Sequence, residues 1–440
     1  MKKALTAKAE PFGIRVKYIY SACVITKTND VIILHDPWFT EGIYDGSWFH
    51  YPKINNPLES IGDVDYIFVS HIHPDHYDGK FLKEYFKKFG VKKIIIADHQ
   101  PNYLLGKMRA DGFSPTVLSE ILIIGKTNIE IIPHKTGSIS DIDSAIVIKY
   151  FQNDKTHCVV NVNDINFEST EDDSMLDFLK NNAGEIDILL CGHTGAGPYP
   201  QTYYDISSEE VDFQAKKKKE LFFNRYKKVI NKLNARVNIP FAGKYILGGK
   251  LVSLNEHRGV ADPVEVLDFD KNAIILADNG GEIDTVTFKP SNERLLKYDQ
   301  KYIQHRLEEL KYVQMDYEKL FSFNEIRQLP LKRLLVSATS NAVTKSECDD
   351  NYFYAINLPN GNYAVINANK NSSKSIFFTE NIDELPQSYS EIIIDPRYLF
   401  GLLTHIYHWN NAEIGSQYNI RRISSSYNRK AKEFLFYLTI

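Results

Sequence analysis

Short apolar runs alternate with polar turns along the first part of the chain. Six such runs, rich in β-branched side chains, lie at 31–34, 66–69, 94–97, 129–132, 145–148 and 159–162. Runs of this length and composition are typical of strands that are buried on at least one face. Polar residues cluster just beyond the ends of these runs. We therefore expect a sheet whose loop rim carries the chemistry.

Helical spacing of apolar residues is less common and occurs at 81–89, 211–233 and 293–313. The pattern of apolar and polar residues changes after residue 321. Two strand-like segments flank the turn 358–361 there, and a helical pattern follows at 399–409. A chain of 440 residues suits a large domain and a smaller one better than a single core. We predict an α/β protein with one domain at 1–295 and a smaller α+β domain at 296–440.

Composition narrows the classes of function. The net charge of −4 provides no basic field for nucleic acid or an anionic membrane, and no run approaches the ~18 apolar residues of a membrane helix. Four cysteines without a CxxC pair are expected to be free thiols, and they exclude an iron–sulfur domain on this chain. The first 11 residues lack the apolar run of a secretory signal. These features predict a cytoplasmic protein.

The strongest chemical signal follows the predicted strand 66–69 directly. Four potential ligands occur there within six residues, namely His71, His73, Asp75 and His76. Imidazole and carboxylate together suit zinc, iron or manganese. In a tight turn, His71 and His73 can face one ion while Asp75 and His76 face another. The pattern predicts a site for two divalent metal ions, with zinc as the first choice and iron or manganese as alternatives.

One turn cannot complete two coordination shells, so further ligands should also lie at strand ends. Asp164 follows the run 159–162 and is the preferred bridging carboxylate. His134 is a candidate to cap the first ion, and Asp143 is its alternative. His193 and His257 are later options, although a lone histidine is more often structural.

Two other features are expected to support such a site without binding metal. Asp36 follows the run 31–34, where its carboxylate could accept hydrogen bonds from the ligand turn and hold it rigid. The glycine-rich loop 192–200 would let backbone N–H groups approach an anionic substrate. We predict substrate contacts from Gly195, Gly197 and Tyr199.

Two metal ions about 3.5–4 Å apart favour hydrolysis, because they lower the pKa of bound water to about 7 and polarise the substrate. The first hypothesis is therefore a metallohydrolase in which metal-bound hydroxide attacks an ester, amide or phosphoester bond. Asp75 would also orient the nucleophile.

The HxHxDH turn, with Asp36 upstream and Asp164 downstream, resembles the metallo-β-lactamase superfamily. Within it, the chain is most similar to the part of the CMP-N-acetylneuraminate hydroxylase family that follows the Rieske domain. That similarity extends to four further stretches, 36–38, 192–200, 239–243 and 408–415 followed by Arg421 and Arg422. The resemblance implies an αβ/βα sandwich with a dinuclear site at the sheet edge. It also implies a small anionic, sugar-nucleotide-like or phosphoester substrate.

Two departures from that family keep other functions open. The Rieske domain is missing, and the place of the last metal-binding histidine reads as residues 240–243, Pro-Phe-Ala-Gly. The second hypothesis is therefore the oxygenase component of a sugar-nucleotide hydroxylase, which receives electrons from a separate Rieske or ferredoxin partner. The third is a non-catalytic binding module. Tyr407, Trp409 and Tyr418 could form a lid, a contact in a homo-oligomer or part of a core.

Overall fold

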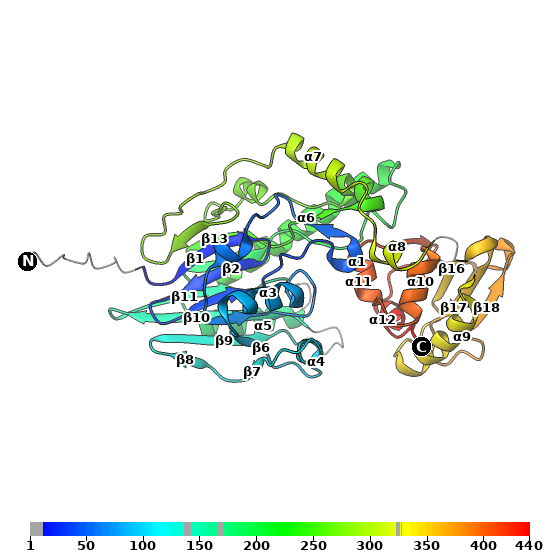
Figure 1. Ribbon diagram of the computed structural model, residues 1–440, viewed down its shortest axis with the longest axis horizontal. Helices are drawn as coiled ribbons and strands as arrows, with labels where there is room; N and C mark the ends of the chain where they lie inside the picture. The colour runs from blue at the N-terminus through cyan, green and yellow to red at the C-terminus, as the bar shows by residue number, and fades with distance from the viewer. Residues whose placement is uncertain (1–11, 136–141, 166, 168–169, 323–325, 327) are drawn as a thin grey trace, which may run out of the picture.

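Two β-sheets face each other in the larger part of the molecule (Figure 1). The computed structural model describes residues 12–440 apart from 136–141, 166, 168–169, 323–325 and 327. The first sheet has the order β15 (Gly281–Asp284), β1 (Arg15–Tyr20), β2 (Cys23–Lys27), β3 (Ile32–His35), β5 (Tyr66–Phe68), β6 (Lys93–Ala97) and β7 (Thr116–Leu118). The second has the order β13 (Val237–Phe241), β12 (Ile188–Gly192), β11 (Lys155–Asn161), β10 (Ser144–Gln152), β9 (Thr127–Pro133) and β8 (Leu122–Ile124).

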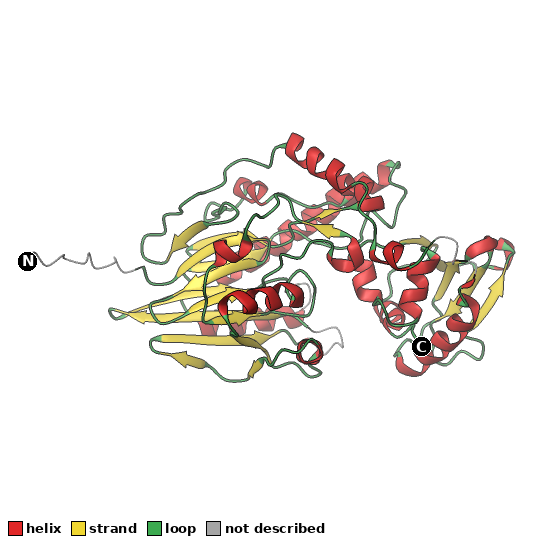
Figure 2. Ribbon diagram, in the orientation of Figure 1, coloured by secondary structure: helices red, strands yellow, loops and turns green. Residues whose placement is uncertain are grey.

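Alternate side chains along each strand point to opposite faces, and both faces of each sheet are buried. Ile33 and Phe68 of the first sheet meet Ile146 and Val159 of the second in a core between the sheets. The outer face of the first sheet packs under α3 (Gly79–Phe89) and α4 (Tyr103–Ala110). That of the second packs under α5 (Thr170–Ala183) and α6 (Glu209–Leu233). The result is the predicted αβ/βα sandwich, with helices outside both sheets (Figure 2).

A smaller sheet follows in the C-terminal part, as predicted. Its order is β18 (Ile376–Thr379), β17 (Tyr363–Asn367), β16 (Phe353–Asn357), β19 (Tyr389–Ile393) and β20 (Asn419–Ile423). It packs with α9 (Leu331–Lys345), α10 (Pro396–Leu403), α11 (Trp409–Ile414) and α12 (Arg429–Phe436).

The core of this C-terminal part continues into the sandwich. It contains Tyr398 and Trp409 together with Trp38, Tyr44 and Trp48. The segment α1 (Ile43–Gly46) contacts both α11 and α8 (Asp316–Leu320). Because the two parts share one buried cluster, side chains from both can reach the same site. The predicted boundary at residue 295 stays a prediction.

Two predicted helices need correction. The pattern at 293–313 forms a helix only at α7 (Gln300–Leu310), because Glu293 bridges to Leu276 and Asp299 caps the helix through the N–H of Lys301. The pattern at 399–409 is divided between α10 and α11. The chain turns between them at His405, which has a φ of 62°.

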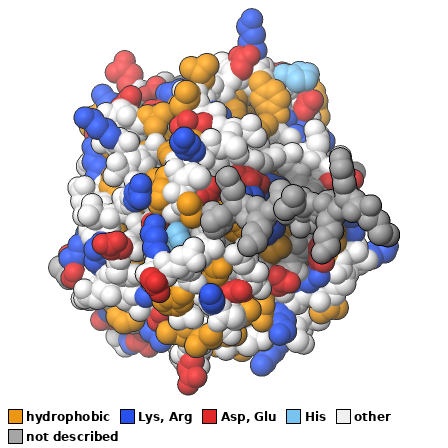
Figure 3. Space-filling view, turned by 90° about the vertical axis from the view of Figure 1, so that its left-hand side faces the viewer, with side chains coloured by type: hydrophobic (Ala, Val, Ile, Leu, Met, Phe, Trp, Pro, Cys, Tyr) orange, Lys and Arg blue, Asp and Glu red, His pale blue; other side chains and the backbone are white. Residues whose placement is uncertain are grey.

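Of the roles open to Tyr407, Trp409 and Tyr418, the structure supports a place in the core, because all three are buried in the C-terminal part. Basic and acidic side chains are interspersed on the face at the N-terminal end of the molecule (Figure 3).

No helix in the described part of the chain combines the length and the apolar character that crossing a membrane requires. The cysteines, all four within the described residues, are buried free thiols.

Candidate metal centre

The HxHxDH motif lies in a tight turn at the edge of the first sheet, which we call the ligand turn (residues 70–76). It follows β5, which pairs in parallel with β3 and β6, so the carboxyl ends of these strands meet at one edge. The N–H of His76 donates to the carbonyl of His73 at 3.0 Å and closes the turn.

Asp36, which directly follows β3, contacts the ligand turn through both oxygens of its carboxylate. Its Oδ1 accepts the backbone N–H of Ser70 at 2.7 Å, and its Oδ2 accepts the Ser70 hydroxyl at 2.8 Å. The same Oδ2 lies 3.0 Å from His76 Nδ1. This carboxylate therefore leaves the other nitrogen of His76, Nε2, facing the interior of the site.

The first half of the site consists of the buried imidazole of His71 and the half-buried imidazole of His73. His71 Nε2 lies 2.9 Å from His73 Nδ1. Burial, with the nearby His76, lowers the pKa of His71 well below 6.5 and that of His73 to about 4. Both rings are therefore neutral at pH 7, and neutral imidazole is the form that binds metal. Two ring nitrogens thus face one point.

The second half combines an imidazole with carboxylates. His76 Nε2 lies 3.2 Å from Asp164 Oδ2 and 3.5 Å from Asp75 Oδ2. Burial alone would lower the pKa of His76, but the neighbouring carboxylates outweigh it and raise this pKa well above 6.5. Burial would likewise raise the pKa of Asp164, but His76 holds it below its usual value. The surroundings at this point therefore stabilise a positive charge.

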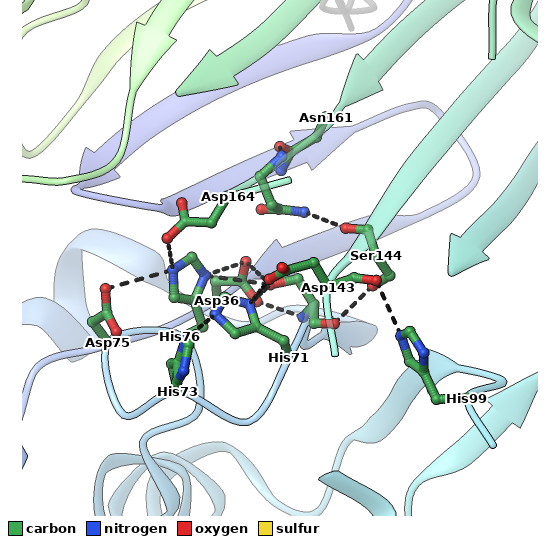
Figure 4. A network of polar contacts seen from close by, with 12 residues as sticks. Asp36, His71, His73, Asp75, His76, His99, Asp143, Ser144, Asn161 and Asp164 are labelled. Carbon is green, nitrogen blue, oxygen red and sulfur yellow. Dashed lines mark hydrogen bonds and ion pairs between the residues drawn. The ribbon is translucent and has the colours of Figure 1, made fainter. Parts of the chain in front are cut away.

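The two halves adjoin at Asp164, which follows β11 of the second sheet. The donor atoms of His71, His76 and Asp164 all lie within 4.8 Å of one another. Figure 4 shows the side chains of the ligand turn and Asp164 converging on one region between the sheets. Buried neutral imidazoles beside carboxylates are a donor set that fits zinc, iron or manganese. We call His71, His73, Asp75, His76 and Asp164 the metal cluster.

The structure separates the remaining ligand candidates. Asp143 Oδ1 lies 3.6 Å from His71 Nδ1, whereas the ring of His134 lies beside that of Phe167. Asp143 thus lies at the nitrogen of His71 that faces away from His73.

His193 and His257 are not brought to the metal cluster. His193 Nε2 lies 3.2 Å from the carbonyl oxygen of Ala261, and its side chain lines a separate small cavity. His257 Nδ1 lies 2.8 Å from a carboxylate oxygen of Asp212. His193 lies away from the metal cluster because of the direction of its side chain. Its neighbours Gly192 and Thr194 line the cavity beside the metal cluster instead.

A cavity of about 340 Å³ opens beside the metal cluster. His73, Asp75 and Asp164 line one side of it, and Gly195 and Gly197 line another. A Cβ on Gly195 would lie 2.0 Å from the ring of Phe222, so this position requires glycine. Tyr199 faces away, because its hydroxyl donates to Gln214 on α6 at 2.5 Å. Of the three predicted substrate contacts, the two glycines therefore lie at the cavity and Tyr199 does not.

Several residues at the site were not predicted. The Tyr44 hydroxyl donates to Asp75 Oδ1 at 2.5 Å, and Asn410 Nδ2 lies 3.0 Å from His73 Nε2. Arg225 from α6 and Lys432 from α12 bring basic groups to the cavity wall. Asn410 stands 337 positions after His73. No local spacing in the sequence could reveal a contact of that kind.

No family model matches the chain. One similar protein, from Mycolicibacterium smegmatis and named for a Rieske 2Fe-2S iron–sulfur centre, is 30% identical over 245 residues. The match covers 53% of this chain and 44% of that protein. The cytidine monophosphate-N-acetylneuraminic acid hydroxylase of Mus musculus is 22% identical over 260 residues, covering 53% of this chain and 40% of its own. The chain thus spans less than half the length of these relatives.

Similar solved structures include CmlA, a diiron β-hydroxylase from Streptomyces venezuelae, with a TM-score of 0.41 and 14% identity. That match covers 63% of this chain and 55% of the other. Igni18, a metallo hydrolase from Ignicoccus hospitalis, has a TM-score of 0.39 and 16% identity, covering 61% and 97%.

The αβ/βα sandwich with its ligand turn defines a protein of the metallo-β-lactamase fold, as predicted. The predicted resemblance to the CMP-N-acetylneuraminate hydroxylases is confirmed over about half of the chain.

Proposed function

We propose that this chain is a metal-dependent hydrolase with a dinuclear centre. His71 and His73 would hold one divalent cation, and Asp75 and His76 would hold the second. Asp164 would bridge the two, and Asp143, which lies beside the outer nitrogen of His71, would orient that ring. The observation that carries this proposal is the convergence of two neutral imidazoles and a positively polarised histidine–carboxylate pair within one cluster.

Such cations, when bound, lower the pKa of coordinated water to about 7 and polarise a substrate oxygen. The chain itself supplies the remaining functions. Asp75 is buried, and burial raises its pKa, so its carboxyl group can accept a proton more readily than an exposed aspartate. The Tyr44 hydroxyl holds Oδ1 of this group, which leaves Oδ2 directed toward His76 and the site. Asp75 is therefore placed to orient the nucleophile.

The cavity favours an anionic substrate. Arg225 lines it from α6, and Lys432, which forms an ion pair with Glu413 at 3.0 Å, lines it from α12. Gly195 and Gly197 bring backbone groups to the same cavity. Phe222 adds aromatic surface to the wall, on which a ring can stack. These features support a phosphoester or a sugar-nucleotide-like compound.

His73→Ala tests the metal assignment. We expect the variant to lose metal and activity while it keeps its fold, because one of the two nitrogens of the first half-site is removed. Metal content of protein purified without chelators is the measurement, joined to a screen of phosphoesters, lactones and sugar nucleotides. Unchanged metal content would contradict the assignment.

A second candidate function is the oxygenase component of a hydroxylase. Its support is that the relatives include proteins named as a hydroxylase or for a Rieske centre, of which this chain matches less than half. Iron in the purified protein, together with reduction by a separate Rieske or ferredoxin partner, would favour this function over hydrolysis. Fewer than two bound metals and no turnover would instead favour a binding module.

A further inference from the structure

One short stretch of the C-terminal part contacts His73 of the metal cluster directly and reaches Asp75 through Tyr44. It comprises α11 and the residues that follow it to Gln417. Asn410, near the start of α11, lies 3.0 Å from Nε2 of His73 through its amide nitrogen. Gln417 donates from its side-chain amide to the carbonyl oxygens of Tyr44 and Asp45 at 2.9 and 3.2 Å.

At the first half-site, Asn410 contacts the nitrogen of the His73 ring that faces away from His71. His73 Nδ1 faces His71, so Nε2 points away from the point where the two rings converge. A histidine that binds metal through one nitrogen usually donates the other N–H to an oxygen acceptor, which sets its tautomer and orientation. The oxygen and nitrogen of an asparagine amide exchange places by rotation. Asn410 can therefore present Oδ1 to this N–H.

At the second half-site, the contact acts through Tyr44. This side chain is 2% exposed, and its hydroxyl donates to Asp75. Tyr44 and the next residue, Asp45, have φ values of 54° and 62°, a left-handed backbone conformation that residues other than glycine rarely adopt. Such a conformation persists when surrounding contacts hold it.

Backbone hydrogen bonds close this turn, from Gly46 to Gly42 and from Ser47 to Ile43, and two side-chain contacts from the C-terminal part hold it as well. Gln417 binds its carbonyl oxygens, and the Tyr398 hydroxyl donates to Asp45 Oδ2 at 2.6 Å. Tyr398 and Gln417 are both buried. The position of the Tyr44 hydroxyl therefore depends on residues that lie more than 350 positions later in the chain.

We propose that the C-terminal part completes the metal centre by positioning one ligand in each half. Asn410 positions His73 for the first cation. Gln417 and Tyr398 hold Tyr44, whose hydroxyl positions Asp75 for the second cation. These four are positioning residues, and the proposal rests on the dinuclear centre of the proposed function. Because coupling is reciprocal, metal binding also stabilises the contact between the two parts of the molecule.

The first test compares two neighbouring asparagines of α11. Asn410→Ala is expected to weaken binding of one of two Co²⁺ equivalents by about 10- to 100-fold, measured by chelator competition, and to change the Co²⁺ absorption spectrum. Asn411→Ala is the matched control, because the described contact of Asn411 is its backbone carbonyl, which accepts the N–H of Gly415. Equal Co²⁺ affinities and spectra in the two variants would overturn the role of Asn410.

If Asn410→Ala folds poorly, the variant Asn410→Asp tests the role of Asn410 instead. A carboxylate can only accept a hydrogen bond, so it preserves the contact with a donating Nε2–H. We expect Co²⁺ affinity at least equal to that of the unchanged protein, and weaker binding would overturn the assignment of Nε2 as the donor.

The second test compares two buried tyrosines. Tyr44→Phe is expected to weaken the other Co²⁺ equivalent by a similar factor, because Asp75 loses its hydroxyl partner. Tyr317→Phe is the control, since the Tyr317 hydroxyl is buried without a hydrogen-bond partner among the described residues. Equal Co²⁺ binding by these two variants would overturn the role of Tyr44.

The unchanged protein separates this inference from the proposed function. If it binds fewer than two Co²⁺ equivalents, the dinuclear proposal itself fails. If it binds two and only one pair of variants differs, positioning is limited to one half-site and the inference as stated is overturned.

Discussion

Asp36 shows at the scale of a single residue how a carboxylate can shape a metal site without binding metal. It is completely buried and accepts hydrogen bonds from both the backbone and the side chain of Ser70. It also lies beside His76 Nδ1, which fixes the direction of the opposite nitrogen. Carboxylates in this role orient a ligand histidine and increase its basicity.

Asp36→Asn should therefore weaken metal binding by about 10- to 100-fold. The neutral amide cannot accept from His76 and Ser70 together as a carboxylate does, and one of its hydrogen-bonding groups becomes a donor. Metal affinity by chelator competition is the measurement. Asp63→Asn serves as a control, because the side chain of Asp63 is 67% exposed. If both variants keep the original affinity, the role assigned to Asp36 is wrong.

At the scale of elements, α3 begins directly after the ligand turn and is fastened to the loop that follows β3. Asp78 caps α3 by accepting the N–H of Phe81 at 2.9 Å. The same carboxylate accepts the N–H groups of Phe39 and Thr40 at 3.0 and 2.7 Å. One side chain thus joins the start of the helix to a neighbouring loop.

Asp78→Ala should lower the free energy of unfolding by about 2–4 kcal/mol, because the cap is lost and two loop N–H groups lose their acceptor. Asp299→Ala provides the comparison. Asp299 caps α7 by accepting the N–H of Lys301, so its loss should cost about 1 kcal/mol. Urea denaturation of both variants measures the difference. Equal losses would show that the loop contacts of Asp78 add nothing.

At the scale of the whole molecule, buried neutral histidines link stability to pH. Burial lowers the pKa of His35 and His50 to about 3 and that of His193 to about 4, from the ordinary value of 6.5. Below pH 6.5 the unfolded chain therefore binds more protons than the folded chain. The free energy of unfolding should fall as the pH drops from 6.5 toward 4.

Urea denaturation of chelator-treated protein at pH 7 and pH 5 measures this dependence. His193→Gln should make the loss between these two pH values smaller than in the unchanged protein, because one titrating group is removed. An identical loss in the variant would exclude His193 as a source of the pH dependence.

Much of the sandwich was predictable, because each buried strand carries a local signature. The run 66–69 and its neighbours match strands of the two sheets, and α3 and α6 match the predicted helical spacing. Helix ends were less predictable, since the start of α7 depends on the cap at Asp299 and on a bridge from Glu293 to Leu276. A contact between distant segments produces no periodic pattern in the sequence of either segment.

The sequence by itself determined the ligand turn, because His71, His73, Asp75 and His76 are close in the chain and a tight turn keeps them close in space. Only the tertiary structure decided which distant groups join them. It brought Asp164 and Asp143 to the site and directed His193 to another cavity. It also placed Tyr44 and Asn410 against two of the ligands. The physical reason is that these positions depend on how separate sheets and helices pack, which is a property of the shared core rather than of any local segment.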